Sequence, residues 1–307
     1  MTLKDILRAV RTRQWAKNGL LFGGFIFAGR LHEPLSQLVP DGLRVMMAFA
    51  CFCALSGAAY LINDWVDIDR DRAHPTKRNR PLASGRISKQ GALVLLVSLL
   101  LSALVLGAAV GLSGVGTWGF AGAAVFYFVQ TLAYSLRLKH EVIIDVLCVA
   151  AGFLVRVVAG CLAVPVAISP WILFCTFNLA LFVALNKRRA ELLEVGESGT
   201  TRKVLKGYSV PMLDTFIAVT AGLTIISYSL YTFNSRQSKL LGPQFGETPS
   251  LMISIPFVLY GVFRFLVLAH SSPVGGEPEQ MLRDKPMLIN GVLWILLVSG
   301  ITVWSAR

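Results

Sequence analysis

Long runs of apolar residues, separated by short polar segments, extend along the whole chain. Most of these runs hold about 20 residues, which is enough for a helix to cross a hydrocarbon core roughly 30 Å thick. The first run is shorter and rich in glycine. The pattern predicts an all-α, polytopic membrane protein with nine transmembrane helices and no soluble domain. The nine candidate spans cover about residues 15–32, 43–63, 90–110, 115–135, 142–162, 168–186, 211–231, 250–270 and 286–304.

The composition agrees with this pattern and limits the classes of partner. Of the 307 residues, 55% are hydrophobic and only 15% are charged, whereas soluble domains carry about 25% charged residues. The formal net charge is +12. Because the basic residues lie between apolar spans and not on a soluble domain, they favour membrane lipids and anionic substrates as partners, and not nucleic acid.

The distribution of Lys and Arg predicts the orientation in the membrane. With the N-terminus inside, 22 of the 29 Lys and Arg residues fall in inner segments and five in outer segments. Cytoplasmic segments of membrane proteins carry such an excess. We therefore expect a protein of the cell membrane with a cytoplasmic N-terminus and cytoplasmic loops at 64–89 and 187–210. The oligomeric state is not set by the sequence, and a homo-oligomer is compatible with it.

Four aspartates follow the second apolar run, in "NDWVDIDRD" (63–71). If the helix continues at about 100° per residue, Asp64, Asp67 and Asp71 fall within an arc of about 100°, together with Tyr60 and Asn63. Asp69 lies on the other side. Carboxylates this close repel one another, and a bound divalent cation removes that repulsion. Hard oxygen ligands in small number suit Mg²⁺, which shares its coordination shell with substrate phosphates.

Two interpretations of this motif remain open on physical grounds. The acids either pair with Arg70, Arg72 and Lys77 at an ordinary charged helix end, or they form a metal and diphosphate site with the basic run that follows. That run includes Lys77, Arg78 and Arg80.

The motif resembles the N-D-x-x-D-x-x-x-D motif of the UbiA-type intramembrane prenyltransferases, and "RAHPTKRNRPLASGRIS" (72–88) is similar to the segment that follows it in that family. The resemblance implies a UbiA-like arrangement of nine transmembrane helices around a central cavity, with residues 1–307 as one domain. It also implies that Asp64, Asp67 and Asp71 are catalytic and bind Mg²⁺.

Three further segments carry candidate substrate-binding residues. In "RAVRTRQWAKNGLLF" (8–22), Arg13 and Lys17 are neighbours on a helix and Asn18 is adjacent; they set topology or hold an anionic headgroup. This segment resembles the R-P-x-Q-W-x-K-N segment of one UbiA branch, the decaprenyl-phosphate phosphoribosyltransferases, with Thr12 in place of the proline.

The segment "YSLRLKHEVIIDVLCVAAGFLVRVVAG" (134–160) resembles the same branch. Tyr134 and Lys139 lie at the predicted cytoplasmic turn. Asp145 and Arg156 are eleven residues apart and share a helix face to within about 20°. An arginine in a membrane span is costly and faces a polar cavity or a partner, so Arg156 either pairs with an acid or binds a phosphate.

The end of the sixth span carries a departure from the common family pattern. UbiA prenyltransferases carry a second aspartate-rich motif, D-x-x-x-D, at this point. Here the chain has "KRRAEL" (187–192), which resembles the K-R-x-A-E-L of the phosphoribosyltransferase branch. Lys187, Arg188 and Glu191 are the candidate binding residues of this segment.

The resemblance implies a Mg²⁺-dependent enzyme that transfers a 5-phosphoribosyl group from phosphoribosyl diphosphate to a polyprenyl phosphate, decaprenyl phosphate in that branch. Diphosphate leaves, and the product supplies the arabinose donor of a cell envelope. One alternative is a UbiA prenyltransferase that moves a polyprenyl group onto an aromatic or quinone precursor. A second, from another class, is a membrane transporter of an anionic solute, although three carboxylates on one face do not suit an anion carrier without a metal.

Overall fold

The computed structural model describes residues 2–27, 34–73, 77–113, 117–164, 166, 170–198, 203–234, 250–271 and 284–304. In these ranges the regular structure is helical and contains no strand. The all-α, polytopic fold class is therefore confirmed. Parts of the chain between the predicted spans, 235–249 and 272–283 among them, lie outside the described residues, as does His74.

Seven helices in the described ranges are long and apolar enough to cross a membrane. They correspond to the second through eighth predicted spans. An eighth helix, α12 (Lys285–Trp304), has a shorter apolar stretch, so the predicted number of nine spans is not confirmed. The seven lie on α3 (Leu35–Val66), α5 (Lys89–Leu112), α6 (Thr117–Leu136), α7 (Ile144–Ala163), α8 (Pro170–Ser198), α9 (Val210–Asn234) and α10 (Ile255–Ser271), which follows the 3₁₀-helix η7 (Ser250–Ser254).

The first predicted span does not form one long helix in its described part. The chain instead forms a 3₁₀-helix, η1 (Thr12–Leu20), and a short α-helix, α2 (Leu21–Phe27). Gly19 and Gly23 fall in this stretch. Glycine costs about 1 kcal/mol relative to alanine in a helix interior, which explains why an apolar run with several glycines does not give one regular helix.

The described residues form two compact units. Unit 1 contains α1 (Leu3–Ala9), η1, α2, α3, α4 (Ile68–Ala73), α5, α6 and the part of α7 from Val155 onward. Unit 2 contains α7 up to Leu154, the 3₁₀-helix η5 (Lys203–Gly207), and α8, α9, η7, α10 and α12. The expectation of a single domain stays a prediction.

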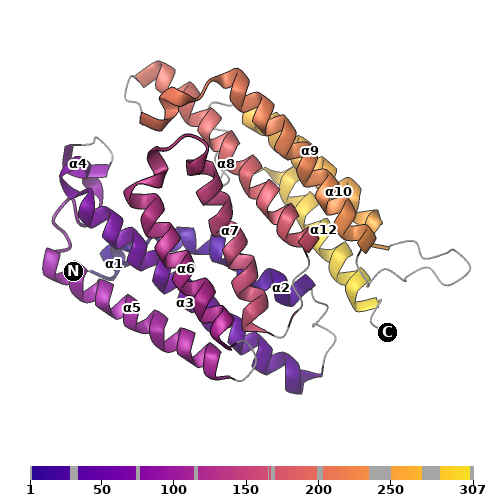
Figure 1. Ribbon diagram of the computed structural model, residues 1–307, viewed down its shortest axis with the longest axis horizontal. Helices are drawn as coiled ribbons and strands as arrows, with labels where there is room; N and C mark the ends of the chain where they lie inside the picture. The colour runs from indigo at the N-terminus through magenta and orange to yellow at the C-terminus, as the bar shows by residue number, and fades with distance from the viewer. Residues whose placement is uncertain are drawn as a thin grey trace, which may run out of the picture. The chain divides into compact units, whose positions relative to one another are not determined.

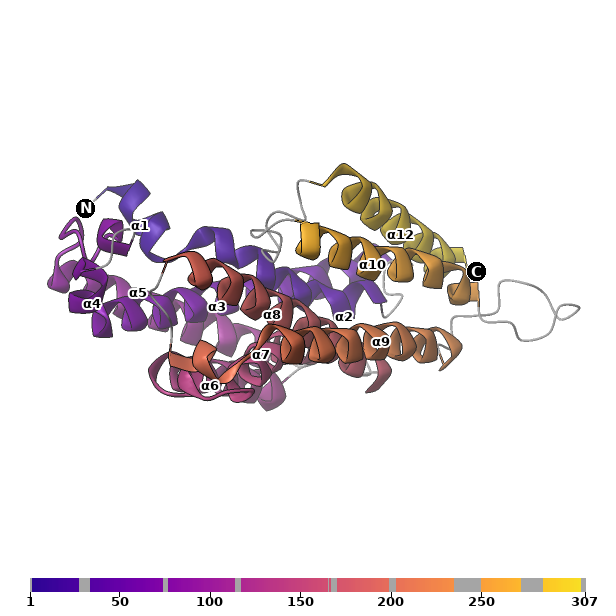
Figure 2. The same cartoon turned by 90° about the horizontal axis from the view of Figure 1, so that it is seen from above.

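In unit 1, α3 is the central helix and packs against both α5 and α6 (Figures 1 and 2). Its side chains are buried from Cys51 to Ala59. Phe52 stacks near Phe120 and Tyr127, with ring centroids 6.1 and 4.8 Å apart. In contrast, α5 exposes a leucine-rich and valine-rich face, which is the surface expected of a lipid-facing helix.

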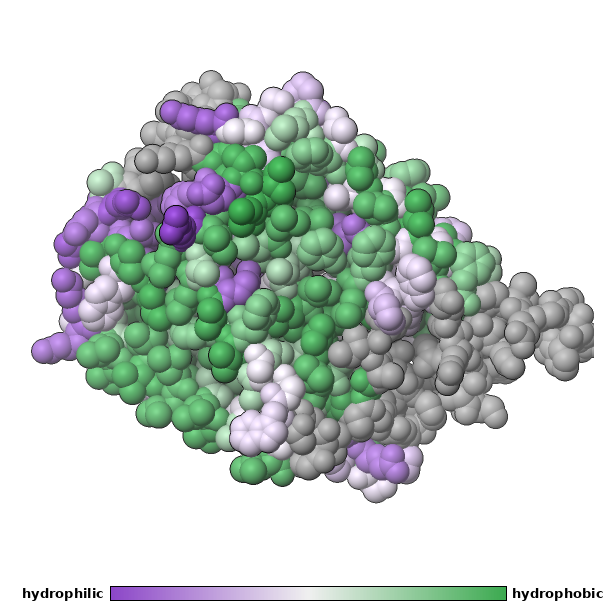
Figure 3. Space-filling model, in the orientation of Figure 1, coloured by the Kyte–Doolittle hydropathy of each residue, from purple (hydrophilic) through white to green (hydrophobic). Residues whose placement is uncertain are grey.

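The polar side chains of unit 1 gather at one end. Figure 3 shows hydrophilic residues at the end that carries α4, next to a largely hydrophobic surface. The short helix α4 itself has the sequence IDRDRA. The end of unit 1 with α4 is thus the polar end of an otherwise apolar bundle.

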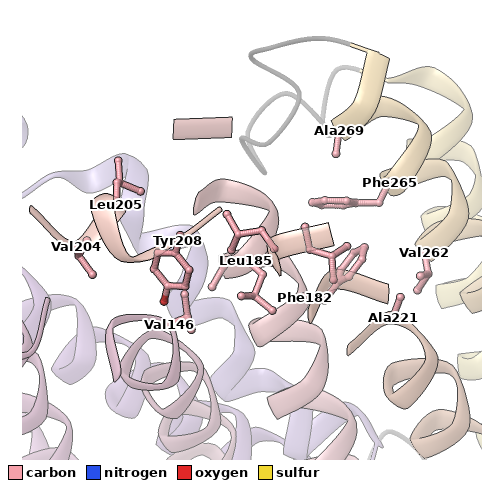
Figure 4. Close-up of a cluster of buried hydrophobic side chains, with 13 residues drawn as sticks. Val146, Phe182, Leu185, Val204, Leu205, Tyr208, Ala221, Val262, Phe265 and Ala269 are labelled. Carbon is pink, nitrogen blue, oxygen red and sulfur yellow. The ribbon is translucent and has the colours of Figure 1, made fainter. Parts of the chain in front are cut away.

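In unit 2, α8 packs along α9, α9 contacts α10, and α10 contacts α12. A core of buried side chains joins these helices to η5 and to the start of α7, and Figure 4 shows Phe182, Leu185, Tyr208 and Phe265 within it. Phe182 and Phe265 lie 5.0 Å apart between ring centroids. Helices in lipid associate through such close packing, because lipid chains are as apolar as the side chains themselves.

Candidate functional site

The aspartate motif lies where α3 passes into α4. Helix α3 ends at Val66 and Asp67 caps it. The backbone N–H of Asp67 donates to the carbonyl of Asn63 at 3.0 Å, and the N–H of Asp71 donates to the carbonyl of Asp67 at 2.8 Å. The chain therefore keeps a nearly helical course through a break at Asp67.

Two of the three predicted metal ligands, Asp64 and Asp71, are buried and share one cation, Arg80. Each carboxylate is only 3% exposed at the residue level. Arg80 Nη1 lies 2.6 Å from Asp71 Oδ2 and 3.1 Å from Asp64 Oδ1. Two buried carboxylates are stable only with compensating positive charge, so this position requires a cation.

A compact turn places Arg80 there. Leu82 and Ile87 are buried in a small core with Ala9 and Leu61. The N–H of Ile87 donates to the carbonyl of Pro81 at 3.0 Å. Gly85 between them has φ of +76°, a conformation that favours glycine. The "PLASG" segment (81–85) is thus a folded turn that holds Arg80 against the aspartates.

Arg11 is a second cation at this site, and the sequence did not single it out. Its Nη2 atom lies 2.6 Å from Asp64 Oδ1. Its guanidinium also lies over the ring of Tyr60, 4.5 Å from the centroid, which is the geometry of a cation–π contact. Arg11 has φ of +52° and precedes η1, and such a backbone conformation in a residue other than glycine is often found at functional sites.

The other two aspartates lie apart. Asp67 is 3.6 Å from Arg70, whose side chain is 83% exposed. The side chain of Asp69 is 87% exposed and 3.4 Å from Arg72, so Asp69 lies in solvent as the helical arc predicts. In the described part of the chain, no three His, Cys, Asp or Glu side chains come together closely enough to hold a metal ion. The arginine that joins Asp64 to Asp71 and the helix break at Asp67 explain the difference from the predicted three-carboxylate face.

A second polar cluster in unit 1 surrounds Arg156 within the span. Arg156 Nε donates to Asn18 Oδ1 at 2.8 Å, and Nη2 donates to the hydroxyl of Tyr127 at 2.7 Å. The guanidinium lies 4.7 Å from the centroid of the Tyr127 ring. Asn18 in turn donates to Cys53 Sγ at 3.3 Å. These contacts are to neutral groups, and they orient the guanidinium.

Unit 2 carries a third cluster, which we call the Arg188 cluster: Asp145, Arg188, Glu191 and Tyr208. Arg188 Nε lies 2.9 Å from Asp145 Oδ2, and Arg188 Nη1 contacts Glu191 Oε2. Asp145 is 1% exposed and Arg188 4% exposed. The hydroxyl of Tyr208 donates to Asp145 Oδ1 at 2.7 Å. Tyr208 lies 20 residues beyond Arg188, and no motif pointed to it.

The remaining predicted residues are distributed less closely. Asp145 and Arg156 both lie on α7 but belong to different units and have different partners. Among these remaining residues, the half-buried ones are Asn63, Lys77, Tyr134 and Lys139. The exposed members are Arg13, Lys17, Arg78 and Lys187.

An apolar groove with a volume of about 500 Å³ opens on unit 1 between α3, α5 and α6. Small residues of α5 hollow its floor, among them Ala103, Gly107 and Gly111. Cys51 and Leu55 of α3 lie at its inner wall. Leu55 precedes Asp64 by nine residues on the same helix, or about 14 Å along the axis. The volume and the apolar lining of the groove suit a hydrocarbon chain.

The long apolar helices of the described residues define an integral membrane protein. At the polar end of unit 1, the buried Asp64 and Asp71 lie against Arg11 and Arg80. Residues 21–190 match the model of the UbiA prenyltransferase family. The chain belongs to the UbiA prenyltransferase family.

Among curated proteins, the chain is 32% identical to the decaprenyl-phosphate phosphoribosyltransferase of Mycolicibacterium smegmatis, over 99% of this chain and 94% of that protein. It is 31% identical to the decaprenyl-phosphate phosphoribosyltransferase of Corynebacterium glutamicum, over 95% of this chain and 85% of that protein. The fold is similar to that of a UbiA homolog from Archaeoglobus fulgidus bound to DMAPP and Mg²⁺, with a TM-score of 0.69 and 18% identity over 97% of this chain and 99% of that one. At that identity the likeness supports the fold alone.

Proposed function

We propose that this protein transfers the 5-phosphoribosyl group of phosphoribosyl diphosphate to a polyprenyl phosphate, such as decaprenyl phosphate, with release of diphosphate. We place it in the plasma membrane with its polar end in the cytosol, where phosphoribosyl diphosphate is made. The product would serve the synthesis of an arabinose donor for the cell envelope.

The observation that carries the proposal is the buried Arg188 of α8, just beyond the predicted sixth span. A second aspartate-rich motif at this position would bind a second metal ion. Here Arg188 takes the position, held between Asp145 and Glu191. A guanidinium binds phosphate oxygens directly and keeps its charge at every physiological pH. The extended similarity to two phosphoribosyltransferases supports the same choice.

Asp64 and Asp71 fit a divalent cation by the chemistry of their donors. Their oxygens are hard ligands, and their burial already requires positive charge, which Arg11 and Arg80 supply. We propose that these two aspartates hold Mg²⁺ together with the substrate diphosphate. When bound, Mg²⁺ would neutralise charge on the diphosphate.

The reaction breaks the bond between C1 of the ribose and the diphosphate oxygen, and the diphosphate leaves with the electron pair. A phosphate oxygen of the lipid forms the new bond to C1, which has oxocarbenium character in the transition state. Because a phosphate is ionised at neutral pH, no strong general base is required. Arg11 and Arg80 would bind the leaving diphosphate, where preorganised positive charge stabilises the developing negative charge.

The groove of unit 1 would receive the polyprenyl chain. Its lining is apolar and its volume is about 500 Å³. It begins on α3, the helix that carries Asp64, so a chain in the groove would lead toward the polar end of the same helix. Arg156, Asn18 and Tyr127 offer donors within unit 1 for a phosphate group.

The test is turnover by the purified protein with labelled phosphoribosyl diphosphate, decaprenyl phosphate and Mg²⁺. A lipid-linked phosphoribose is the expected product, and omission of Mg²⁺ should abolish it. Absence of this product, together with turnover of an allylic diphosphate and an aromatic acid, would establish prenyl transfer instead.

A further inference from the structure

A short segment between α8 and α9 is packed against the turn before α7. Val204 and Leu205 of η5 are each 2% exposed and belong to the core of unit 2. Gly207 lies so close to the turn that a Cβ atom built on it would be 2.4 Å from Val142 Cγ2. The segment therefore has a defined position on the turn, and it brings Tyr208 to the start of α7, beside Val146 (Figure 4).

The hydroxyl of Tyr208 makes two hydrogen bonds. It donates to Asp145 Oδ1 at 2.7 Å and accepts from the backbone N–H of Ile143 at 2.7 Å. Ile143 has φ of +69°, which is uncommon for a β-branched residue. Burial, and then the neighbouring Asp145 carboxylate, raise the pKa of Tyr208, so the hydroxyl keeps its proton at neutral pH and can donate.

The hydrogen bond from Tyr208 orients the Asp145 carboxylate toward Arg188. Arg188 Nε and Asp145 Oδ2 are 2.9 Å apart and form an ion pair. At the other oxygen of this carboxylate, Oδ1, the hydroxyl of Tyr208 donates a hydrogen bond of 2.7 Å.

We propose that Tyr208 is a positioning residue: by fixing the Asp145 carboxylate and the Ile143 amide, it sets the orientation in which Arg188 binds a diphosphate or phosphate group. The inference rests on the proposed function in taking Arg188 as an anion-binding residue. Tyr208 supplies no charge and does not touch the substrate. Its removal leaves the charge of Arg188 intact and removes the constraint on its direction.

The test compares Tyr208→Phe with Tyr228→Phe. Tyr228 is a matched control because it is also buried in unit 2, at 4% exposed, and its hydroxyl also has two partners, Ser254 Oγ at 2.6 Å and Trp294 Nε1 at 2.9 Å. Both variants lose one buried hydroxyl, so both should lower the melting temperature. Their effects on anion binding should differ.

The primary measurement is the Kd of inorganic diphosphate with Mg²⁺, by calorimetry on the full chain in detergent. We expect Tyr208→Phe to weaken binding about tenfold, the size of effect that loss of one hydrogen bond to a charged group produces. KM for phosphoribosyl diphosphate should rise by a similar factor, while KM for the lipid should change little. Tyr228→Phe should bind diphosphate like the wild type.

A double-mutant cycle separates positioning from general stability. If Tyr208 acts through Asp145, then Tyr208→Phe in an Asp145→Asn background should add little further loss of diphosphate binding. Additive losses, or equal weakening in Tyr208→Phe and Tyr228→Phe, would overturn the inference. If Tyr208→Phe is not recovered as folded protein, the Asp145→Asn variant alone tests the inference. Diphosphate binding by Asp145→Asn with the wild-type Kd would show that Asp145 does not orient Arg188, and it would overturn the inference.

The binding measurement also separates this inference from the proposed function. Diphosphate is a product of phosphoribosyl and of prenyl transfer alike. A wild-type protein that binds diphosphate but does not turn over phosphoribosyl diphosphate would refute the proposed function, and the comparison of Tyr208→Phe with Tyr228→Phe would still decide the role of Tyr208. A wild-type protein that does not bind diphosphate would overturn the inference on Tyr208.

Discussion

At the scale of single residues, the polar end of unit 1 depends on two arginines from separate segments that meet at one buried carboxylate. Arg11 precedes η1 and Arg80 follows α4, and both contact Asp64 Oδ1. The two guanidinium groups balance the charge of the two buried carboxylates, Asp64 and Asp71. The same arrangement would accept a diphosphate whose own charge is shared with Mg²⁺.

Asp64 can be tested against Asp69, which belongs to the same motif. We expect Asp64→Asn to lower kcat by at least about 100-fold, because it removes a proposed metal ligand from a site that stabilises transition-state charge. Asp69→Asn should retain kcat within about twofold, since its side chain is 87% exposed. The measurement is the initial rate as a function of Mg²⁺ concentration. An Asp64→Asn enzyme with normal Mg²⁺ dependence would exclude Asp64 from metal binding.

Sequence reasoning identified part of this chemistry. The aspartates were found because their spacing repeats with the helix, and Arg188 with Glu191 because they are three residues apart on one helix. Arg11 and Tyr208 were missed because each meets its partner across a long separation, 53 residues from Arg11 to Asp64 and 63 from Asp145 to Tyr208. Periodicity within one helix carries no information about such contacts.

At the scale of elements, unit 1 requires a close approach between α7 and the start of α2. A Cβ atom built on Gly160 would lie 2.0 Å from the backbone oxygen of Leu21. Small residues allow helix backbones to approach in membranes. Only glycine at position 160 permits this packing.

We therefore expect Gly160→Ala to destabilise the protein by about 1–3 kcal/mol or more, since the obstacle is backbone and cannot rotate away. The measurement is the melting temperature in detergent. Gly222→Ala on α9 is the control, because a Cβ atom there has no neighbour within 4 Å, and alanine is the better helix former. Equal melting temperatures for the two variants would contradict the close approach of α7 and α2.

The groove between α3, α5 and α6 gives a second test at this scale. The substitution Gly107→Leu would place a large side chain in the groove. The backbone tolerates a side chain there, because a Cβ atom built on Gly107 meets only Cys51 Sγ, at 3.8 Å. We expect Gly107→Leu to raise KM for decaprenyl phosphate about tenfold, with KM for phosphoribosyl diphosphate unchanged. Gly122→Leu on α6 lies outside the groove lining and should leave both constants unchanged. Equal KM values for decaprenyl phosphate in the two variants would show that the groove does not bind the polyprenyl chain.

At the scale of the whole molecule, the bias of positive charge predicts which end faces the cytosol. Asp69 follows the end of α3, and Leu35, which is 73% exposed, begins it. The 32 residues of α3 span about 48 Å at 1.5 Å per residue, so the two positions are expected on opposite sides of the membrane.

Single cysteines can test this orientation. The native cysteines are buried or half-buried, which keeps background labelling low. We expect Asp69→Cys to react with a membrane-impermeant maleimide only in inside-out vesicles, and Leu35→Cys only in right-side-out cells. The opposite pattern would place the aspartate site outside the cytosol and away from phosphoribosyl diphosphate.

The sequence by itself determined the helical membrane fold, the positions of seven long spans and the aspartate motif. Apolar run length and helical spacing are local properties of the chain, and they can be read without knowing which segments meet. Only the tertiary structure decided that η1 and α2 replace one regular first span, that Arg80 joins Asp64 to Asp71, and that Tyr208 donates a hydrogen bond to Asp145, the partner of Arg188. These features depend on close packing and on buried charges that need partners from distant segments, and such partners are chosen by the folded chain.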